Sequence, residues 1–123
     1  MPAVIDLDVD GALKRVGGDR ELLVRIIDFV VEDSPQFVTR METALESGEY
    51  SEVERAAHSL KGLVSNLHCK AVQDKALEVE ALAHNGDRAG MGSAIEVLSR
   101  LTQEMMLKVY ETRRSLEAQL HTS

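Results

Sequence analysis

His58 is the residue of this chain whose type and neighbours are best suited to chemistry, and it lies in the run Ala57-His58-Ser59-Leu60-Lys61-Gly62. A neutral imidazole keeps a nitrogen lone pair that can attack an electrophile. Lys61 follows by three residues, so on a helix its ammonium can reach an anionic group attached to the ring. Gly62 costs a helix about 1 kcal/mol relative to alanine, which indicates that room is needed beside the histidine. The three residues predict a nucleophilic imidazole that carries an anionic group and is approached by another protein.

The element that carries His58 must be a helix that exposes it. At about 100° per residue, His58 lies opposite the centre of an unbroken apolar face, which consists of Val53, Ala56, Ala57, Leu60, Leu63, Val64 and Leu67. The exposed arc holds Arg55 and the short residues Ser59, Ser65 and Asn66. Because short side chains let a second surface come close, we expect these four residues to form the rim of a partner-docking surface.

Helical periodicity runs through the rest of the chain, and no stretch alternates apolar and polar residues as a strand does. We expect a short helix over 6–16, ended by Gly17-Gly18, and longer helices over 19–47, 52–68 and 70–85. A last helix is expected to begin after Asp87, with a first turn weakened by Gly90 and Gly92, and to continue beyond 110. Short connections between helices with one apolar face each predict an all-α fold, an antiparallel four-helix bundle with a short additional N-terminal helix as a lid. Residues 1–123 are expected to form a single domain, whose last residues, about ten, project or fray.

Two local signals refine these boundaries. Pro35 lacks an amide hydrogen and clashes with the preceding turn, so we expect it to interrupt and kink the second helix around 33–36. Ser51 and Glu54 have the spacing of a capping box, which places the start of the helix with the candidate histidine near Glu52.

Charge and composition exclude several classes of partner. The formal net charge is −7 and the pI is about 5.0, so neither nucleic acid nor an anionic membrane is attracted over long range, and a protein is the expected partner. No run approaches the ~18 apolar residues of a membrane span. The single cysteine, Cys69, is typical of a reducing compartment, so we expect a cytoplasmic protein. His68, His84 and His121 are expected to be surface or helix-end residues, and without clustered ligands we assign no metal site.

The run around His58, followed by Ser65-Asn66-Leu67, resembles the signature of histidine-containing phosphotransfer (HPt) domains of phosphorelays. The resemblance extends over nearly the whole chain, through Gly17-Gly18-Asp19, Glu46-Ser47-Gly48, Val79-Glu80 and Gly86-Asp87. It implies a helical bundle whose exposed histidine accepts a phosphoryl group from the phosphoaspartate of a receiver domain and passes it on. On this basis His58 is the phosphoacceptor, Lys61 stabilises the charge and Gly62 provides clearance.

The resemblance also implies partners and a class of protein. The partners are a response-regulator receiver domain, a hybrid histidine kinase, or both. Mg²⁺ is expected on the receiver, with no cofactor in this chain. The protein is then a stoichiometric phosphocarrier rather than an enzyme, and a monomer.

Two features of the site stay undecided at this point. A carboxylate that accepts the Nδ1 hydrogen of His58 would leave Nε2 as the nucleophile. Glu80 takes that place by resemblance, whereas Glu54, four residues before the histidine, competes for it. The chain also departs from the family after Leu67, where His68-Cys69 replaces the usual small residue, and the larger side chain is expected to alter the turn or the docking rim.

Two other functions fit parts of the sequence. The phosphoacceptor and dimerisation region of a sensor kinase has an acidic residue after its histidine and a proline shortly beyond, whereas this chain has Ser59 and no proline after Pro35. A non-catalytic helical interaction bundle that binds receiver domains without phosphotransfer has no need of His58, Lys61 and Gly62 together. Phosphotransfer is therefore the preferred prediction.

Overall fold

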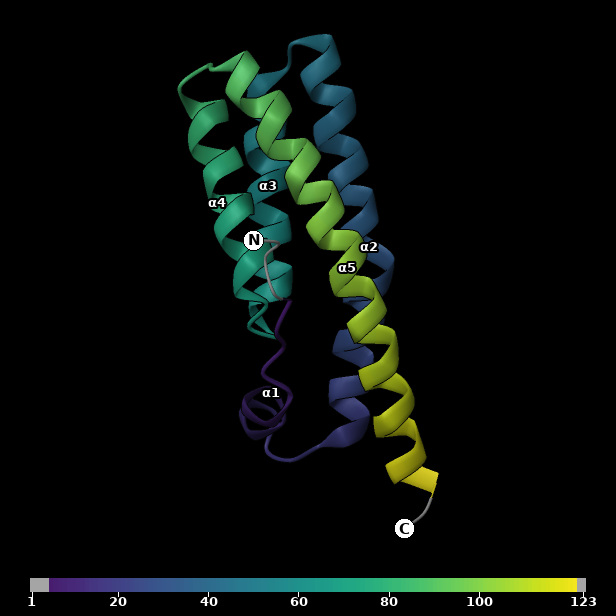
Figure 1. Cartoon of the computed structure of the whole chain (residues 1–123). Coiled ribbons are helices and arrows are strands. Elements are labelled where there is room, and N and C mark those ends of the chain that lie inside the picture. Colours follow the sequence, from purple (N-terminus) through teal and green to yellow (C-terminus); the bar gives the residue numbers. More distant parts are fainter. Residues whose placement is uncertain (1–4, 122–123) are drawn as a thin grey trace.

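The computed structural model describes residues 5–121, and within them every regular element is a helix (Figure 1). The five helices are α1 (Val9–Arg15), α2 (Arg20–Ser47), α3 (Tyr50–Ser65), α4 (Lys70–His84) and α5 (Arg88–His121). The predicted all-α fold is confirmed.

The four long helices form a bundle in which each packs against two neighbours. Helix α3 lies between α2 and α4, and α5 closes the ring by packing against α2 and α4. Successive helices run in opposite directions along the bundle (Figure 1). The predicted antiparallel four-helix bundle with a short N-terminal helix is therefore confirmed.

The core is aliphatic, as the small number of aromatic residues requires. Its largest fully buried side chains are those of Leu23, Ile27, Met41, Leu60, Leu67, Met91, Leu98 and Met105. Helices α3 and α4 pack against each other, and several of their buried residues are small, namely Ala56, Ala57, Ala76 and Ala83. Small residues let two helices approach closely, so polar side chains along the outer edge of this interface can meet across it.

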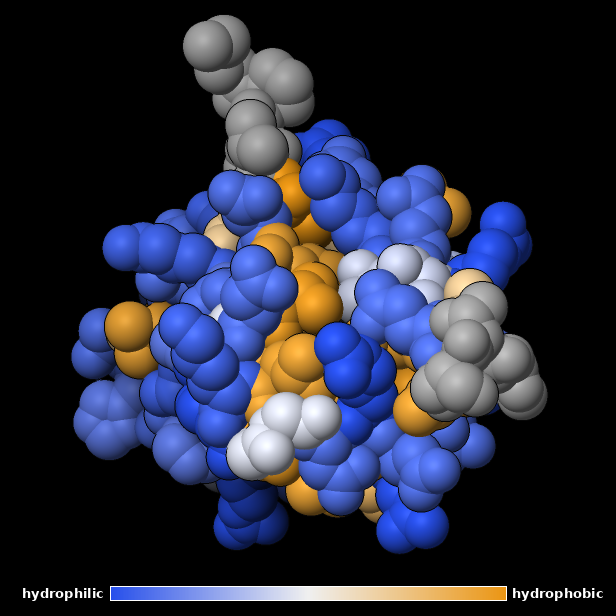
Figure 2. Space-filling view, turned by 90° about the horizontal axis from the view of Figure 1, so that it is seen from below, coloured by the Kyte–Doolittle hydropathy of each residue, from blue (hydrophilic) through white to orange (hydrophobic). Residues whose placement is uncertain are grey.

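Helix α1 covers the end of the bundle where α2 begins and α5 ends (Figure 1). Seen from that end, apolar side chains gather along the middle of the surface with hydrophilic ones around them (Figure 2). Leu13 and Val16 pack there, partly buried, against the core. The helix is shorter than the predicted 6–16 because the carboxylate of Asp8 caps it, accepting the Gly11 N–H at 2.9 Å.

The predicted interruption of the second helix is wrong. Helix α2 runs without a break through Pro35. Val30 and Val38, on either side of the proline, are both buried in the same core. Packing on both sides thus holds the helix together despite the missing amide hydrogen, which normally costs an interior helix position about 3 kcal/mol.

The predicted capping box is also wrong. Helix α3 begins at Tyr50, so Ser51 lies inside it, and the residue before the helix, Glu49, makes no side-chain capping bond in the described structure. Gly48 has a φ of 78°, which turns the chain sharply enough for α3 to start two residues earlier than expected. Glu54 is drawn to another partner, described below.

The last helix begins at Arg88, directly after Asp87, as predicted. Asp87 caps it by accepting the Gly90 N–H at 2.9 Å. A Cβ at Gly90 would lie 2.7 Å from Oδ2 of Asp87 and 2.9 Å from Cδ2 of Leu82. This glycine therefore permits a close approach at the helix start instead of weakening it.

Helix α5 also continues to His121, at the end expected to project or fray. Leu116 is buried, and Nε of Arg20 donates a hydrogen bond to Oε1 of Gln119 at 2.8 Å. The two helices α2 and α5 extend together past the ends of α3 and α4 (Figure 1). Among the described residues, no helix is both long and apolar enough to cross a membrane.

Candidate functional site

His58 projects from the middle of α3 into solvent, with 68% of its side chain exposed. On the opposite side of the helix, six of the seven apolar residues are buried and Leu63 is partly buried. The geometry predicted from helical periodicity is therefore present in the structure.

One carboxylate, that of Glu80 on α4, bridges His58 and Lys61 on α3. Its Oε1 lies 3.0 Å from Nδ1 of His58, and its Oε2 accepts a hydrogen bond from Nζ of Lys61 at 2.9 Å. The side chain of Glu80 is 22% exposed and that of Lys61 is 29% exposed. The bridge is therefore partly buried between the helices, whereas the imidazole is largely exposed.

This bridge sets the hydrogen positions on the imidazole. An ionised carboxylate only accepts hydrogen bonds, so Nδ1 of His58 carries a hydrogen, and in the neutral ring the lone pair is then on Nε2. The hydrogen bond from Lys61 holds the pKa of Glu80 below its usual range, with the hydrogen bond from His58 acting in the same direction, while partial burial acts against them. The carboxylate therefore stays ionised, as the bridge requires.

Of the two carboxylates that the sequence left as alternatives, Glu80 contacts His58 and Glu54 does not pair with it. Glu54 turns across the helix interface to His84 in the last turn of α4, with 3.1 Å between its Oε1 and Nδ1 of His84. The sequence could not distinguish them, because the choice depends on how α3 and α4 are aligned.

Gly62 lies in open space. A Cβ built on it meets no atom within 4 Å, and its φ is not in the left-handed region. Nothing within the described chain therefore requires a glycine here.

The four predicted rim residues behave differently from one another. Ser59 is exposed, and Arg55, with 78% of its side chain exposed, lies 3.6 Å from a carboxylate oxygen of Glu52. The side chains of Ser65 and Asn66 instead bond back to the last turn of α3, at the carbonyls of residues 62 and 63. Arg55 and Ser59 thus remain available to a partner, whereas Ser65 and Asn66 finish the helix.

Sequence reasoning missed Leu77. This α4 residue is 52% exposed and stands three residues before Glu80, so it lies on the same side of α4 as the bridge. The signal was present in the sequence, because Leu77 falls outside the α4 stripe that contains Val72, Ala76 and Val79.

The backbone conformation at His68-Cys69 explains how the chain accommodates larger residues where the family usually has a small one. His68 has a φ of 52°, the left-handed conformation that a glycine adopts most readily. His68 is exposed and Cys69 is buried, and burial raises the pKa of the Cys69 thiol. The turn is therefore kept with a larger residue, at the end of α3 and away from His58.

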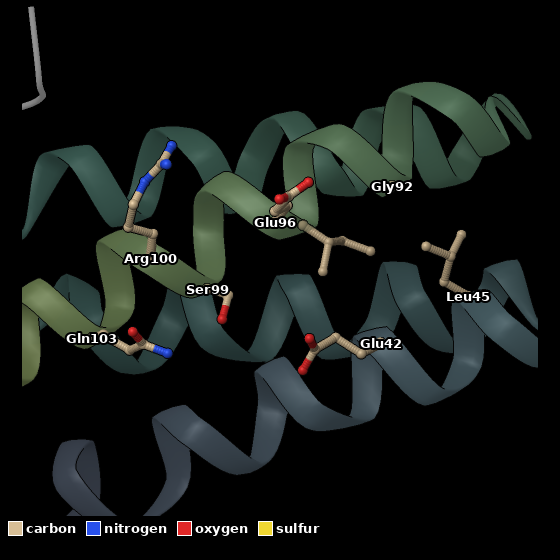
Figure 3. Close-up of a pocket in the computed structure, with 8 residues that line it drawn as sticks. Glu42, Leu45, Gly92, Glu96, Ser99, Arg100 and Gln103 are labelled. Atoms are coloured by element: carbon tan, nitrogen blue, oxygen red, sulfur yellow. The ribbon is translucent and has the colours of Figure 1, made fainter.

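A separate groove of about 450 Å³ lies between α2 and α5. Its lining includes Glu42 and Leu45 of α2 and Glu96, Ser99 and Arg100 of α5 (Figure 3). Since α2 and α5 form the side of the ring opposite to the α3–α4 interface, this groove is remote from His58. No group of three or more metal-ligating side chains occurs among residues 5–121, and the side chain of His121 lies outside the described part of the structure.

Comparison with known proteins gives a family match and a fold match. The family model for the Hpt domain matches residues 25–121. Histidine-containing phosphotransfer protein B from Pseudomonas aeruginosa PAO1 aligns with a TM-score of 0.81 and 22% identity, over 89% of this chain and 95% of that one. The maize histidine-containing phosphotransfer protein ZmHP2 aligns with a TM-score of 0.74 and 18% identity, over 88% and 79%. At these identities the structural likeness shows the fold, and no curated protein sequence matches significantly.

The bridge makes a prediction about Glu80. Replacing Lys61 with methionine is expected to raise the pKa of Glu80, because the Lys61 hydrogen bond is the largest cause that lowers it. Ionised Glu80 stabilises the fold above the ordinary glutamate pKa of about 4.3, and this contribution is lost as the pH falls through the lower pKa of the folded state. A ¹³C NMR titration of the carboxyl groups, with urea unfolding at several pH values, measures both effects. A Glu80 pKa unchanged in Lys61→Met contradicts the bridge.

Proposed function

Since the chain belongs to the Hpt domain family, we propose that it is a histidine phosphotransfer protein of a two-component phosphorelay, with His58 as its phosphoacceptor. The observation that carries the proposal is the exposed imidazole whose Nδ1 is held by Glu80, at 3.0 Å, leaving Nε2 free toward solvent. The partners are a receiver domain and a hybrid histidine kinase.

The transfer is a displacement at phosphorus. Nε2 of His58 attacks the phosphoryl group of the receiver's phosphoaspartate, the N–P bond forms as the P–O bond breaks, and the aspartate leaves as a carboxylate. Nδ1 keeps its hydrogen throughout, bonded to Glu80. Mg²⁺ bound to the receiver would neutralise charge on the phosphoryl oxygens during the transfer. Transfer to a second receiver reverses these steps.

Lys61 supplies the positive charge on this side of the transfer. Its ammonium has three donors, and one of them bonds to Glu80, so two can face phosphoryl oxygens. Opposite unit charges about 4 Å apart gain about 1 kcal/mol in water and about 4 kcal/mol at the effective dielectric of a partly covered surface. The contribution of Lys61 therefore grows when a partner covers the site.

The protein acts as a carrier and not as a catalyst in turnover. His58 is consumed on accepting the group and regenerated on donating it, while the receiver supplies the acidic residues and metal that organise the reaction. Leu77, exposed beside the bridge, provides an apolar contact on which such a partner can pack.

A phosphorylation assay tests whether His58 is the phosphoacceptor. Receiver domains from the same organism, each labelled with ³²P from acetyl phosphate, are incubated with the protein. Acid-labile label is expected on the wild type and none on His58→Gln, because glutamine has no ring nitrogen to attack phosphorus. His68→Asn, which removes an exposed imidazole at the end of α3 and away from His58, keeps the label. Label that survives in His58→Gln refutes the assignment, and binding without any transfer by the wild type indicates a non-catalytic interaction bundle instead.

Substitutions at Gly62 test whether this glycine leaves room for a partner beside His58. Since a Cβ there meets no atom within 4 Å, Gly62→Ala is expected to stabilise the fold by about 0.5–1 kcal/mol. A larger residue, in Gly62→Gln, is expected to slow transfer from a labelled receiver about tenfold or more, because small displacements at a reacting centre are costly. Transfer from phosphoramidate, a small donor, stays within about twofold of wild type. Equal slowing with both donors contradicts a clearance role.

A further inference from the structure

A second histidine–glutamate pair stands beside the first on the α3–α4 face. His84 Nδ1 lies 3.1 Å from Oε1 of Glu54, and the side chain of His84 is 76% exposed. The pair is crossed relative to the first, since its histidine belongs to α4 and its glutamate to α3.

The two pairs occupy adjacent turns of both helices. Glu54 stands four residues before His58 on α3, and Glu80 stands four residues before His84 on α4. Side chains with this spacing are neighbours on a helix surface. Each carboxylate therefore has one imidazole on its own helix and one across the interface, and in the structure each bonds across.

Other carboxylates near the site are also paired, with basic side chains. Glu80 is tied to Lys61 as well as to His58, and Glu52, on the other flank of α3, lies 3.6 Å from Arg55 and 3.9 Å from Arg40. Beyond Glu54, Nη1 of Arg88, the first residue of α5, donates to the hydroxyl of Tyr50 at the start of α3 at 3.4 Å.

A Glu54 released from His84 would act against phosphoryl acceptance in two ways. Its charge would stand one helical turn from the phosphoryl group on His58 and repel it. It could also accept a hydrogen from the imidazole of His58 in competition with Glu80, and a ring whose hydrogen moves to Nε2 has no lone pair there for the attack.

We infer that His84 is a positioning residue, which keeps the Glu54 carboxylate away from His58 and so preserves both the reactive tautomer and the charge balance of the site. This inference rests on the proposed phosphotransfer function. His84 does not touch the reacting atoms and acts through Glu54.

The test is a double-mutant comparison with phosphoramidate as the donor, which isolates the site from partner docking. His84→Ala is expected to slow phosphorylation of His58 about three- to tenfold. Glu54→Gln is expected to react at or above the wild-type rate, because it removes the charge, and His84→Ala/Glu54→Gln returns to within about twofold of wild type. The matched control is His84→Ala/Glu78→Gln, which removes a carboxylate of α4 that pairs with Lys75 and is expected to stay slow.

A second readout does not depend on phosphorylation. In ¹⁵N–¹H NMR spectra, His58 of the wild type is expected to carry its hydrogen on Nδ1, His84→Ala to show an increased share of hydrogen on Nε2, and the double variant with Glu54→Gln to restore the first state. Circular dichroism confirms that each variant is folded.

The inference is overturned if His84→Ala reacts at the wild-type rate with an unchanged His58 tautomer, or if Glu78→Gln rescues it as well as Glu54→Gln does. A wild type that accepts no phosphoryl group on His58 overturns the proposed function instead, and the tautomer of His58 in the variants then still decides the role of His84.

Discussion

The site depends on one carboxylate shared between two residues of the facing helix. Glu80 accepts the Nδ1 hydrogen of His58 with one oxygen and an ammonium hydrogen of Lys61 with the other. A single side chain thus selects the tautomer of the proposed phosphoacceptor and holds the cation beside it. Because Lys61 balances the charge of Glu80, the bridge leaves no uncompensated anion under the position that a phosphoryl group takes.

That bridge requires α3 and α4 to be aligned to within a fraction of a helical turn. A shift by one residue rotates a helical side chain by about 100°, which would carry Glu80 out of reach. The alignment comes from the packing of α3 against α4, two helices whose buried faces include the small residues Ala56, Ala57, Ala76 and Ala83. Helices α2 and α5 complete the core without contributing a side chain to the bridge. The arrangement of the exposed side chains at the site therefore depends on how the buried faces of α3 and α4 pack.

The sequence predicted what depends on periodicity and missed what depends on alignment between helices. The exposure of His58, the four long helices and the bundle follow from the spacing of apolar residues along each segment. The choice between Glu54 and Glu80 required the relative placement of α3 and α4, which no spacing within one helix contains. The same limit explains the false capping box, since Glu54 bonds to His84 across the interface, and the continuity of α2 through Pro35, which neighbouring helices impose. Leu77 was visible as an exception to the α4 stripe, but its exposure was established only by the structure.

The central claim is that Glu80 holds the hydrogen of His58 on Nδ1 and directs the phosphoryl group to Nε2. The position of the N–P bond tests this claim most directly. The protein is labelled with ¹⁵N in its histidines, phosphorylated, and studied by ¹⁵N and ³¹P NMR at alkaline pH. The account predicts a phosphorus coupling to Nε2 of His58 in the wild type, with Nδ1 still carrying its hydrogen. A wild-type product phosphorylated on Nδ1 would contradict it.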